Sequence, residues 1–198
     1  MEATGETRGR GQAAPLARIS TACPDNLRGI RDRALVLIHF AVAGHEHELA
    51  FNRVRDCADA TGGLVADRRV SKIRPRIIPV PYGFRPSICP VCAWTAWKEA
   101  AELTGPDGYA WRRLHSRWHT VMDGGLQPGS IGDVITRAGE RAGIEIRFTG
   151  HSPRRELATS SRFQGHDQIV IAKQSGWART PRSSPATSKS STSERTTP

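Results

Sequence analysis

The sequence has few cysteines, few tyrosines and no long apolar run. Its four cysteines in 198 residues are too few for the disulfide framework of a small secreted domain, so we expect a reduced compartment, the cytoplasm. The longest apolar stretch, from Ala34 to Gly44, is interrupted by His39 and is too short to cross a bilayer. The first residues, MEATGETRGRGQ, lack the apolar segment of a secretory signal. We therefore expect no membrane partner.

Acidic residues are in the minority. The chain has 19 Asp and Glu against 29 Lys and Arg, which gives a net charge of +10. A surplus of this size favours a polyanionic partner, above all nucleic acid. Residues 1–33 and 179–198 supply half of it, so the denser central segment is more informative. Within that segment no acidic residue separates Arg68, Arg69, Lys72, Arg74 and Arg76.

The spacing of apolar residues changes along the chain. A helical period begins at Asp25 or Asn26, either of which can cap it, and Gly44 can end it. A strand pattern follows, whose last strand carries prolines and so belongs at a sheet edge. The predicted strands span 54–60, 64–70 and 77–80, and the predicted helices 25–44, 89–103, 130–142, 152–163 and 167–174. Residues 109–127 fit neither pattern. We expect an α+β fold, mostly helical, with a small three-stranded antiparallel sheet.

Composition divides the chain into three parts. Residues 1–14 are polar and Gly-rich and predict a disordered arm. Residues 179–198 are rich in Ser and Thr and have no large apolar residue, which predicts a disordered tail. Residues 15–178 are expected to form one domain.

The segment GHSPRRELATS, residues 150–160, places chemically useful groups at a predicted helix start. His151 and Arg154 are three residues apart and can share a helix face. The N–H groups of a helix start attract an anion, the Arg154 guanidinium suits two phosphate oxygens, and His151 can donate or shuttle a proton. A capped surface helix with solvated arginines is the alternative interpretation of the same residues.

This segment resembles the GHSLRRGFAT-type box of the tyrosine recombinases, the phage-integrase family of site-specific DNA strand-transfer enzymes. Other parts of the chain resemble the family in the same order. They are NLRGIRDRALVLIHFAVAGHEHELA (26–50), RRVSKIRPRIIPVPYG (68–83), SICPVCAWTAW (87–97), SIGDVITRAGERAGI (130–144) and AKQSGW (172–177). The resemblance implies the fold of the family's catalytic domain, DNA integration and recombination as the activity of a mobile element, and double-stranded DNA and other recombinase subunits as partners. It implies no cofactor and no metal.

The resemblance also implies roles for individual residues. Lys72 matches the lysine that protonates the leaving 5′ oxygen, and His151 and Arg154 match the histidine and arginine of the box. Trp177 stands where the family has a second His or Trp, and its indole N–H can donate to phosphate. The basic residues expected to contact DNA are Arg68, Arg69, Arg74, Arg76 and Arg155.

Three departures from the family predict impaired catalysis. In the family, the first arginine lies three residues before a Glu-Leu pair. In this chain His45 occupies that position, three residues before Glu48. Because histidine holds a phosphate less well than arginine, we expect the replacement to cost about 3–4 kcal/mol of transition-state binding. No tyrosine follows Trp177, so no nucleophile is identified; Tyr82 and Tyr109 lie elsewhere. An N-terminal core-binding domain is not expected in the chain. The altered C-terminus suggests a replaced or out-of-frame end.

Other interpretations remain open. The chain could be a non-enzymatic DNA-binding remnant or regulator. A small zinc-binding protein using Cys89, Cys92 and two histidines is less favoured, because we expect both cysteines to face the core. The His45–His47 and His115–His119 pairs are not assigned to metal. Trp94, Trp97, Trp111 and Trp118 are expected in the core, although the last two could instead lie along a DNA backbone.

Overall fold

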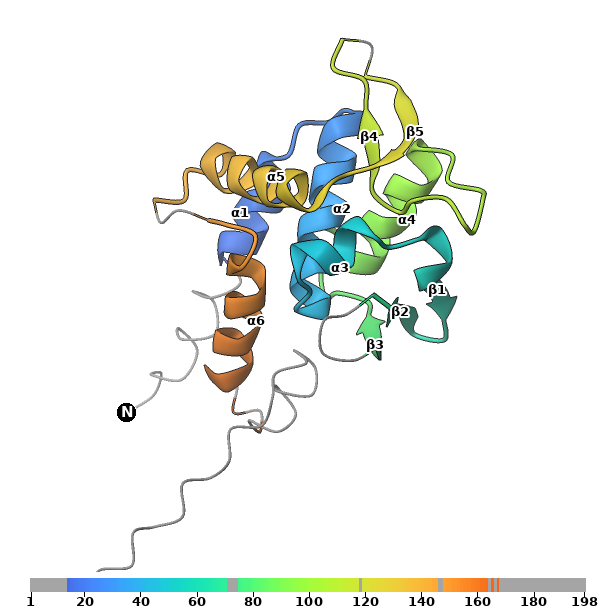
Figure 1. Ribbon diagram of the computed structural model, residues 1–198. Coiled ribbons are helices and arrows are strands. Elements are labelled where there is room, and N and C mark those ends of the chain that lie inside the picture. Colours follow the sequence, from blue (N-terminus) through green and yellow to red (C-terminus); the bar gives the residue numbers. More distant parts are fainter. Residues whose placement is uncertain are drawn as a thin grey trace, which may run out of the picture.

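The computed structural model describes residues 14–70, 75–117, 119–145, 148–163, 165 and 167 (Figure 1). The helices are α1 (Ala14–Ala22), α2 (Leu27–Val42), α3 (Glu46–Ala50), α4 (Pro90–Ala100), α5 (Pro128–Arg141) and α6 (Ser152–Phe163), with short 3-10 turns η1 (Val54–Asp56) and η2 (Pro86–Ile88). The strands are β1 (Cys57–Ala60), β2 (Gly63–Arg68), β3 (Arg76–Pro81), β4 (Arg112–Leu114) and β5 (Val121–Gly125).

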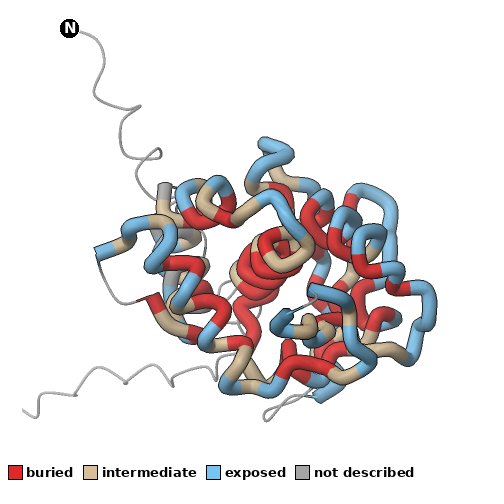
Figure 2. The backbone as a smooth tube through the Cα atoms, turned by 90° about the horizontal axis from the view of Figure 1, so that it is seen from above, coloured by how far each residue is buried: buried red, intermediate tan, exposed pale blue. Residues whose placement is uncertain are grey.

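Helix α2 lies at the centre and is buried along most of its length (Figure 2). The predicted cap at Asn26 is confirmed, because its side chain accepts a hydrogen bond of 3.0 Å from the Gly29 N–H. The predicted end at Gly44 is wrong by one residue. Ala43 adopts the left-handed conformation (φ 46°) and closes the helix with a hydrogen bond of 3.1 Å from its N–H to the Phe40 carbonyl. The chain then turns directly into α3.

The three-stranded antiparallel sheet is confirmed, with the order β1-β2-β3 and the proline-bearing β3 at an edge. The first strand was predicted too long, since Val54–Asp56 form the turn η1 and only Cys57–Ala60 are extended. On one face of β2 and β3 the apolar side chains are buried, namely Leu64, Ala66, Ile78 and Val80. The connection between these strands, Ser71–Arg74, lies outside the described residues.

Tryptophan fills the interior between α4 and the β4–β5 hairpin. Trp94, Trp97 and Trp111 are fully buried, so the alternative that placed Trp111 along DNA is wrong. Trp118 lies outside the described residues. The hairpin occupies the segment 109–127, which the sequence left unassigned, because its strands are short and bulged between Arg112 and Leu114.

The remaining helices agree with expectation except for α1 and α3. The predicted helices at 89–103, 130–142 and 152–163 appear as α4, α5 and α6, and nearly all of 167–174 lies outside the described residues. Neither α3 nor α1 was predicted; α1 buries Leu16 and Ile19 and packs near α5. Among the helices that the structure describes, none is long and apolar enough to cross a membrane.

Candidate functional site

The start of α3 presents His45. Its backbone is extended (φ −98°, ψ 152°) and its N–H donates to Oε2 of Glu48 at 3.1 Å. Glu48 thereby satisfies a backbone group that a helix start otherwise leaves without a partner. The bond fixes the entry of the chain into α3 and leaves the His45 side chain half-buried at the surface.

The start of α6 presents His151. Two reciprocal hydrogen bonds of 2.8 Å join Thr149 and Ser152, one from the Ser152 N–H to the Thr149 carbonyl and one from the Thr149 N–H to Oγ of Ser152. The His151 carbonyl accepts the N–H of Arg155 at 3.1 Å. His151 therefore occupies the capping turn, with its side chain exposed, and the N–H groups of the first helical turn follow it directly in the chain.

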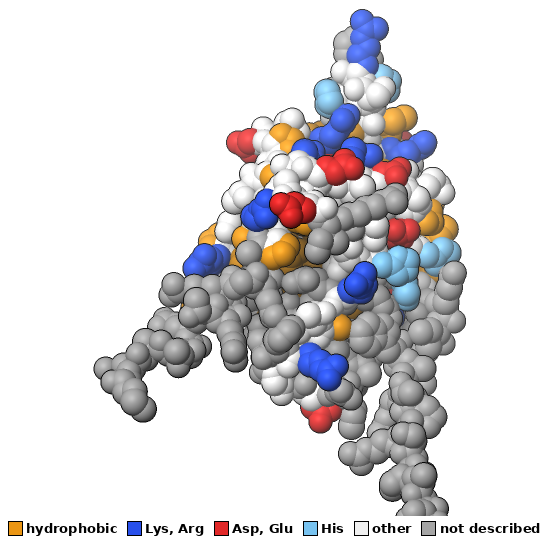
Figure 3. Space-filling view, turned by 90° about the vertical axis from the view of Figure 1, so that its left-hand side faces the viewer, with side chains coloured by type: hydrophobic (Ala, Val, Ile, Leu, Met, Phe, Trp, Pro, Cys, Tyr) orange, Lys and Arg blue, Asp and Glu red, His pale blue; other side chains and the backbone are white. Residues whose placement is uncertain are grey.

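The two histidines lie together although they are far apart in sequence. Their ring centroids are 6.1 Å apart at an interplanar angle of 73°. Figure 3 shows that histidine side chains gather on one part of this face, beside Lys or Arg side chains. The position that the family resemblance assigned to its first arginine thus lies beside the box histidine. The sequence alone could not show this, since the contact depends on how α3 meets α6.

Glu46 sits between α3, α5 and the start of α6. A Cβ added at Gly150 would stand 1.6 Å from Oε1 of Glu46, and one added at Gly132 would stand 2.6 Å away. The Glu46 carboxylate therefore packs directly against the backbone at both glycines, and a side chain at either place would displace it. A carboxylate at the start of α6 stabilises the helix end and competes with any anion that binds there. No local pattern points to Glu46, because it packs against two glycines that are distant in the sequence.

Beneath α3 lies a group of buried polar side chains, which we call the buried polar cluster (His39, Glu48, Arg68 and Arg76). Glu48, 2% exposed, accepts two parallel hydrogen bonds of 3.0 Å from Nη1 and Nη2 of Arg76. Such a paired arrangement is a strong, directional ion pair. It ties β3 to α3, directly behind His45. Sequence reasoning used Glu48 only to locate His45 and missed this role.

Arg68 is the least satisfied member of the buried polar cluster. It is 1% exposed, and none of its three side-chain nitrogens has a hydrogen-bond partner among the residues that the structure describes. Burial lowers the pKa of Arg68, while the nearby Cys57 and Glu48 act in the opposite direction. The structure therefore places Arg68 in the interior, where it cannot contact DNA as we had predicted.

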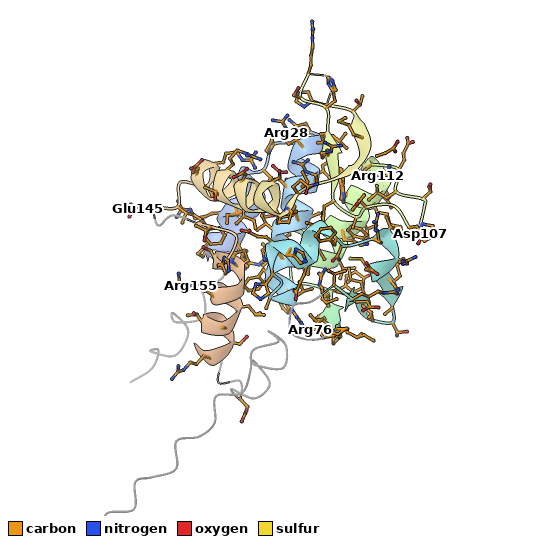
Figure 4. The ribbon with its side chains drawn as sticks, in the orientation of Figure 1. Arg28, Arg76, Asp107, Arg112, Glu145 and Arg155 are labelled. Carbon is orange, nitrogen blue, oxygen red and sulfur yellow. The ribbon has the colours of Figure 1, made fainter. Side chains whose placement is uncertain are left out.

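The other predicted DNA-contacting residues differ in exposure. Arg76 points inward to Glu48 and is held there, so its expected place on the DNA surface also needs correction. Arg69 is exposed but pairs with Asp67 at 2.8 Å and Asp56 at 3.2 Å. Arg155 is exposed on α6, whereas Arg76 lies beneath α3 (Figure 4). Arg74 lies outside the described residues.

Three of the predicted catalytic residues have no described side chain. Lys72 and Trp177 lie outside the described residues altogether. Arg154 is in the first turn of α6, where its backbone is described and its side chain is not. The structure thus brings together His45 and His151, and the helix that carries Arg154 begins beside them.

His39 is the fourth member of the buried polar cluster. Its Nε2 hydrogen-bonds the Gly44 carbonyl at 2.8 Å. Burial lowers its pKa to about 4, with a smaller contribution from Arg68 in the same direction. His39 is therefore neutral at pH 7, and its Nε2 carries the proton donated to Gly44.

The cysteine prediction is half right. Cys89 is buried as expected, whereas Cys92 is exposed because it lies on the outer face of α4. Within the described part of the chain, no group of three or more His, Cys, Asp or Glu side chains could hold a metal ion.

Some known proteins are similar to this chain in sequence or in fold, although no family model matches it. An integrase/recombinase xerD homolog of Selenomonas ruminantium is 30% identical over an alignment of 156 residues that covers 76% of this chain and 45% of that protein. XerA recombinase superposes with a TM-score of 0.64 at 20% identity, covering 83% of this chain and 55% of XerA. XerH bound to a palindromic difH substrate superposes with a TM-score of 0.65 at 15% identity, covering 86% of this chain and 45% of XerH.

The fold is that of a tyrosine recombinase catalytic domain, with the mostly helical body and small antiparallel sheet that the sequence predicted. In sequence the chain is similar to this integrase/recombinase homolog, and in fold it is similar to the XerA and XerH recombinases. It spans about half the length of these relatives, from 45% to 55%.

Proposed function

We propose that this chain is a site-specific recombinase-like protein that binds duplex DNA and holds a backbone phosphate between the starts of α3 and α6. The observation that carries the proposal is the 6.1 Å approach of the His45 and His151 rings. Two imidazoles at this spacing can both donate to the oxygens of one phosphate, because each ring offers an N–H group. The N–H groups of the first turn of α6 add to the attraction, and the Glu46 carboxylate at the same helix start opposes it.

The other groups expected at this phosphate complete the proposed site. Arg154 supplies a forked guanidinium from the first turn of α6, Lys72 supplies a proton for the leaving oxygen, and Trp177 supplies an indole N–H. Structural relatives support DNA and recombinase subunits as partners. XerH was solved on its difH substrate, and lambda integrase, at a TM-score of 0.52, 14% identity and coverage of 86% of this chain and 47% of its own, was solved as a tetramer on a Holliday junction.

We propose further that strand transfer is impaired. His45 has fewer donors than the arginine it replaces and a charge that depends on pH, so it meets the developing charge on phosphate less well. Tyr109 does not face this site. Its ring lies under the Arg53 guanidinium, 3.8 Å from ring centroid to Cζ, and packs against Gly125. Tyr82 follows β3 and is largely exposed.

A DNA-binding assay tests the phosphate site. We expect Arg154→Ala to weaken binding of a duplex about tenfold to a hundredfold, since a hydrogen bond to a charged group contributes roughly 1.5–3 kcal/mol. The slope of log Kd against log salt should also fall by about one. The matched control is Arg162→Ala in the last turn of the same helix, which removes the same charge and should change Kd about twofold. Equal losses in both variants would show that binding is only diffuse charge attraction.

A strand-transfer assay tests the impairment. The full chain is incubated with supercoiled DNA and analysed for nicked product and for protein linked covalently to DNA. We expect neither product from the wild type, and we expect His45→Arg to tighten DNA binding without producing a covalent link. A phosphotyrosyl adduct on the wild-type chain would contradict the proposed impairment and leave the DNA-binding proposal standing.

A further inference from the structure

The first turn of α4 brings two cysteines together. Cys89 is the N-cap residue and Cys92 lies in the first turn, three positions later, so their side chains are neighbours on the helix surface. Sγ of Cys89 accepts the N–H of Cys92 at 3.3 Å and the N–H of Gly83 at 3.1 Å. Backbone N–H groups that converge on a sulfur stabilise its thiolate.

The two sulfurs differ in access and in acidity. Cys89 is fully buried and Cys92 is exposed. Burial opposes ionisation of Cys89, but hydrogen bonds from Cys92, Gly83 and Val91 outweigh it and lower the pKa of that thiol. The hydrogen bond with Cys89 raises the pKa of Cys92. The pair thus combines a stabilised, protected thiolate with a sulfur that a small reagent can reach.

Cys23 and Cys57 show the opposite character. Both are buried, and burial raises the pKa of each. Neither lies three residues from a second cysteine. They serve as internal controls for any reaction of the α4 pair.

We propose that Cys89 and Cys92 form a dithiol–disulfide pair that is oxidised by low-molecular-weight disulfides such as oxidised glutathione. The Cys92 thiol passes its proton to the hydrogen-bonded Cys89 thiolate, and its sulfur then attacks the oxidant, forming a mixed disulfide and releasing one glutathione thiolate, which takes up the proton from Cys89. The thiolate of Cys89 then attacks Sγ of Cys92, closes the Cys89–Cys92 disulfide and releases the second glutathione. Two protein thiols are oxidised and one glutathione disulfide is reduced to two thiols, so the exchange is balanced.

Closing the Cys89–Cys92 disulfide affects the turn at Gly83, which joins β3 to α4. A Cβ at Gly83 would stand 2.7 Å from Cα of Cys89, so this turn packs directly on the start of α4. When Sγ of Cys89 bonds to Cys92, it can no longer accept the Gly83 N–H in the same way. That loss loosens the turn between β3 and α4, on which the exposed side chains of Tyr82 and Phe84 lie.

Peptide mass analysis of the full chain tests the pair. Trypsin leaves residues 77–98 as one peptide, because Arg85 is followed by Pro86, and this peptide contains Cys89 and Cys92 but no other cysteine. After exposure to oxidised glutathione we expect the peptide to lose two hydrogens, to carry no glutathione and to recover its mass on reduction. We expect Cys23 and Cys57 to remain thiols.

Variants separate the two steps. Cys89→Ser should trap a stable glutathione adduct on Cys92, and Cys92→Ser should leave Cys89 unreacted because that sulfur is buried. Cys23→Ser is the control and should behave as the wild type. If Cys89→Ser fails to fold, a time course on the wild type serves instead, with a transient adduct expected before the disulfide. A persistent adduct on wild-type Cys92, an unreacted pair, or thiols protected by stoichiometric zinc would each overturn the proposal.

Discussion

The two sides of α2 have different interiors. Toward α4 and the β4–β5 hairpin the interior is mainly aromatic, and Trp94 and Trp111 meet edge to face at 5.5 Å between ring centroids. Two polar contacts reach the chain of that side, from Nε1 of Trp97 to the Ala110 carbonyl at 2.8 Å and from the buried Arg31, which is paired with Asp32, to the Arg112 carbonyl at 3.3 Å. Toward α3 and β3 the interior is the buried polar cluster, where Glu48 holds two N–H groups of Arg76 and Arg68 has no described hydrogen-bond partner.

The two interiors contribute differently: the aromatic side stabilises the fold, and the polar side fixes the position of α3. Burying aromatic surface stabilises the fold without requiring a particular partner. Burying charges costs desolvation energy, and an ion pair recovers it only when its geometry is good. The charged side lies directly behind His45, where Glu48 bonds both the His45 N–H and Arg76. We therefore interpret the buried polar cluster as the device that positions α3 relative to β3 for the candidate phosphate site.

The largest expected loss of stability comes from removing the charge of the Glu48 carboxylate. Glu48→Gln leaves the Arg76 guanidinium buried without its counter-charge, and loss of one partner of a buried pair costs about 3–5 kcal/mol. Urea unfolding followed by circular dichroism should show this loss in the free energy of unfolding. The matched control, Glu99→Gln on the exposed face of α4, should change it by less than about 0.5 kcal/mol. Similar losses of unfolding free energy in the two variants would mean that the buried polar cluster contributes no more to stability than an exposed carboxylate does.

The next effect is a dependence of stability on pH caused by His39. Its pKa in the folded chain is about 4, below the ordinary value of 6.5, so the unfolded chain binds the proton first as the pH falls. Its contribution is therefore complete above pH 6.5, decreases between pH 6.5 and about 4, and levels off below that, with a total loss of roughly 3 kcal/mol.

Unfolding curves over this pH range measure the effect. His39→Gln removes the titrating group and can still donate to the Gly44 carbonyl, so its free energy of unfolding should decrease less steeply over the same window. A variant whose slope matched the wild type would assign the pH dependence to other groups.

The smallest effect has the opposite sign. Arg68→Met replaces a buried guanidinium that lacks a described hydrogen-bond partner with an apolar side chain of similar length. Since burying such a charge costs more than it returns, we expect unfolding free energy to rise by roughly 1–2 kcal/mol. Thermal unfolding at constant pH measures it, with the exposed neighbour changed in the same way, Arg69→Met, as the control. A large destabilisation by Arg68→Met would show that the guanidinium is required in the interior.

Much of the fold could be predicted from sequence because local rules decide it. The Asn26 cap, the apolar period of α5 and the prolines of β3 act within a few residues, and the elements they predicted are present. Helices α1 and α3 and the β4–β5 hairpin escaped prediction because their patterns are short. The end of α2 was misplaced because Ala43, rather than glycine, takes the left-handed conformation.

The candidate site was predicted less completely. His45 and His151 were both singled out, and their approach agrees with a shared site. Arg68 and Arg76 were interpreted as surface cations, because a row of arginines in a strand does not indicate which face is buried. Glu46 and Glu48 drew no functional prediction, since their importance depends on glycines and arginines distant in sequence.

The sequence by itself determined the longer helices, the three-stranded sheet, the positive charge and the segments that resemble the recombinase family, because each depends on spacing or composition. Only the tertiary structure decided which charges face inward. Burial depends on the packing of α3 against α5 and of β2 against β3, and no local pattern encodes it. That packing turned two predicted DNA contacts into interior groups and brought two distant histidines together.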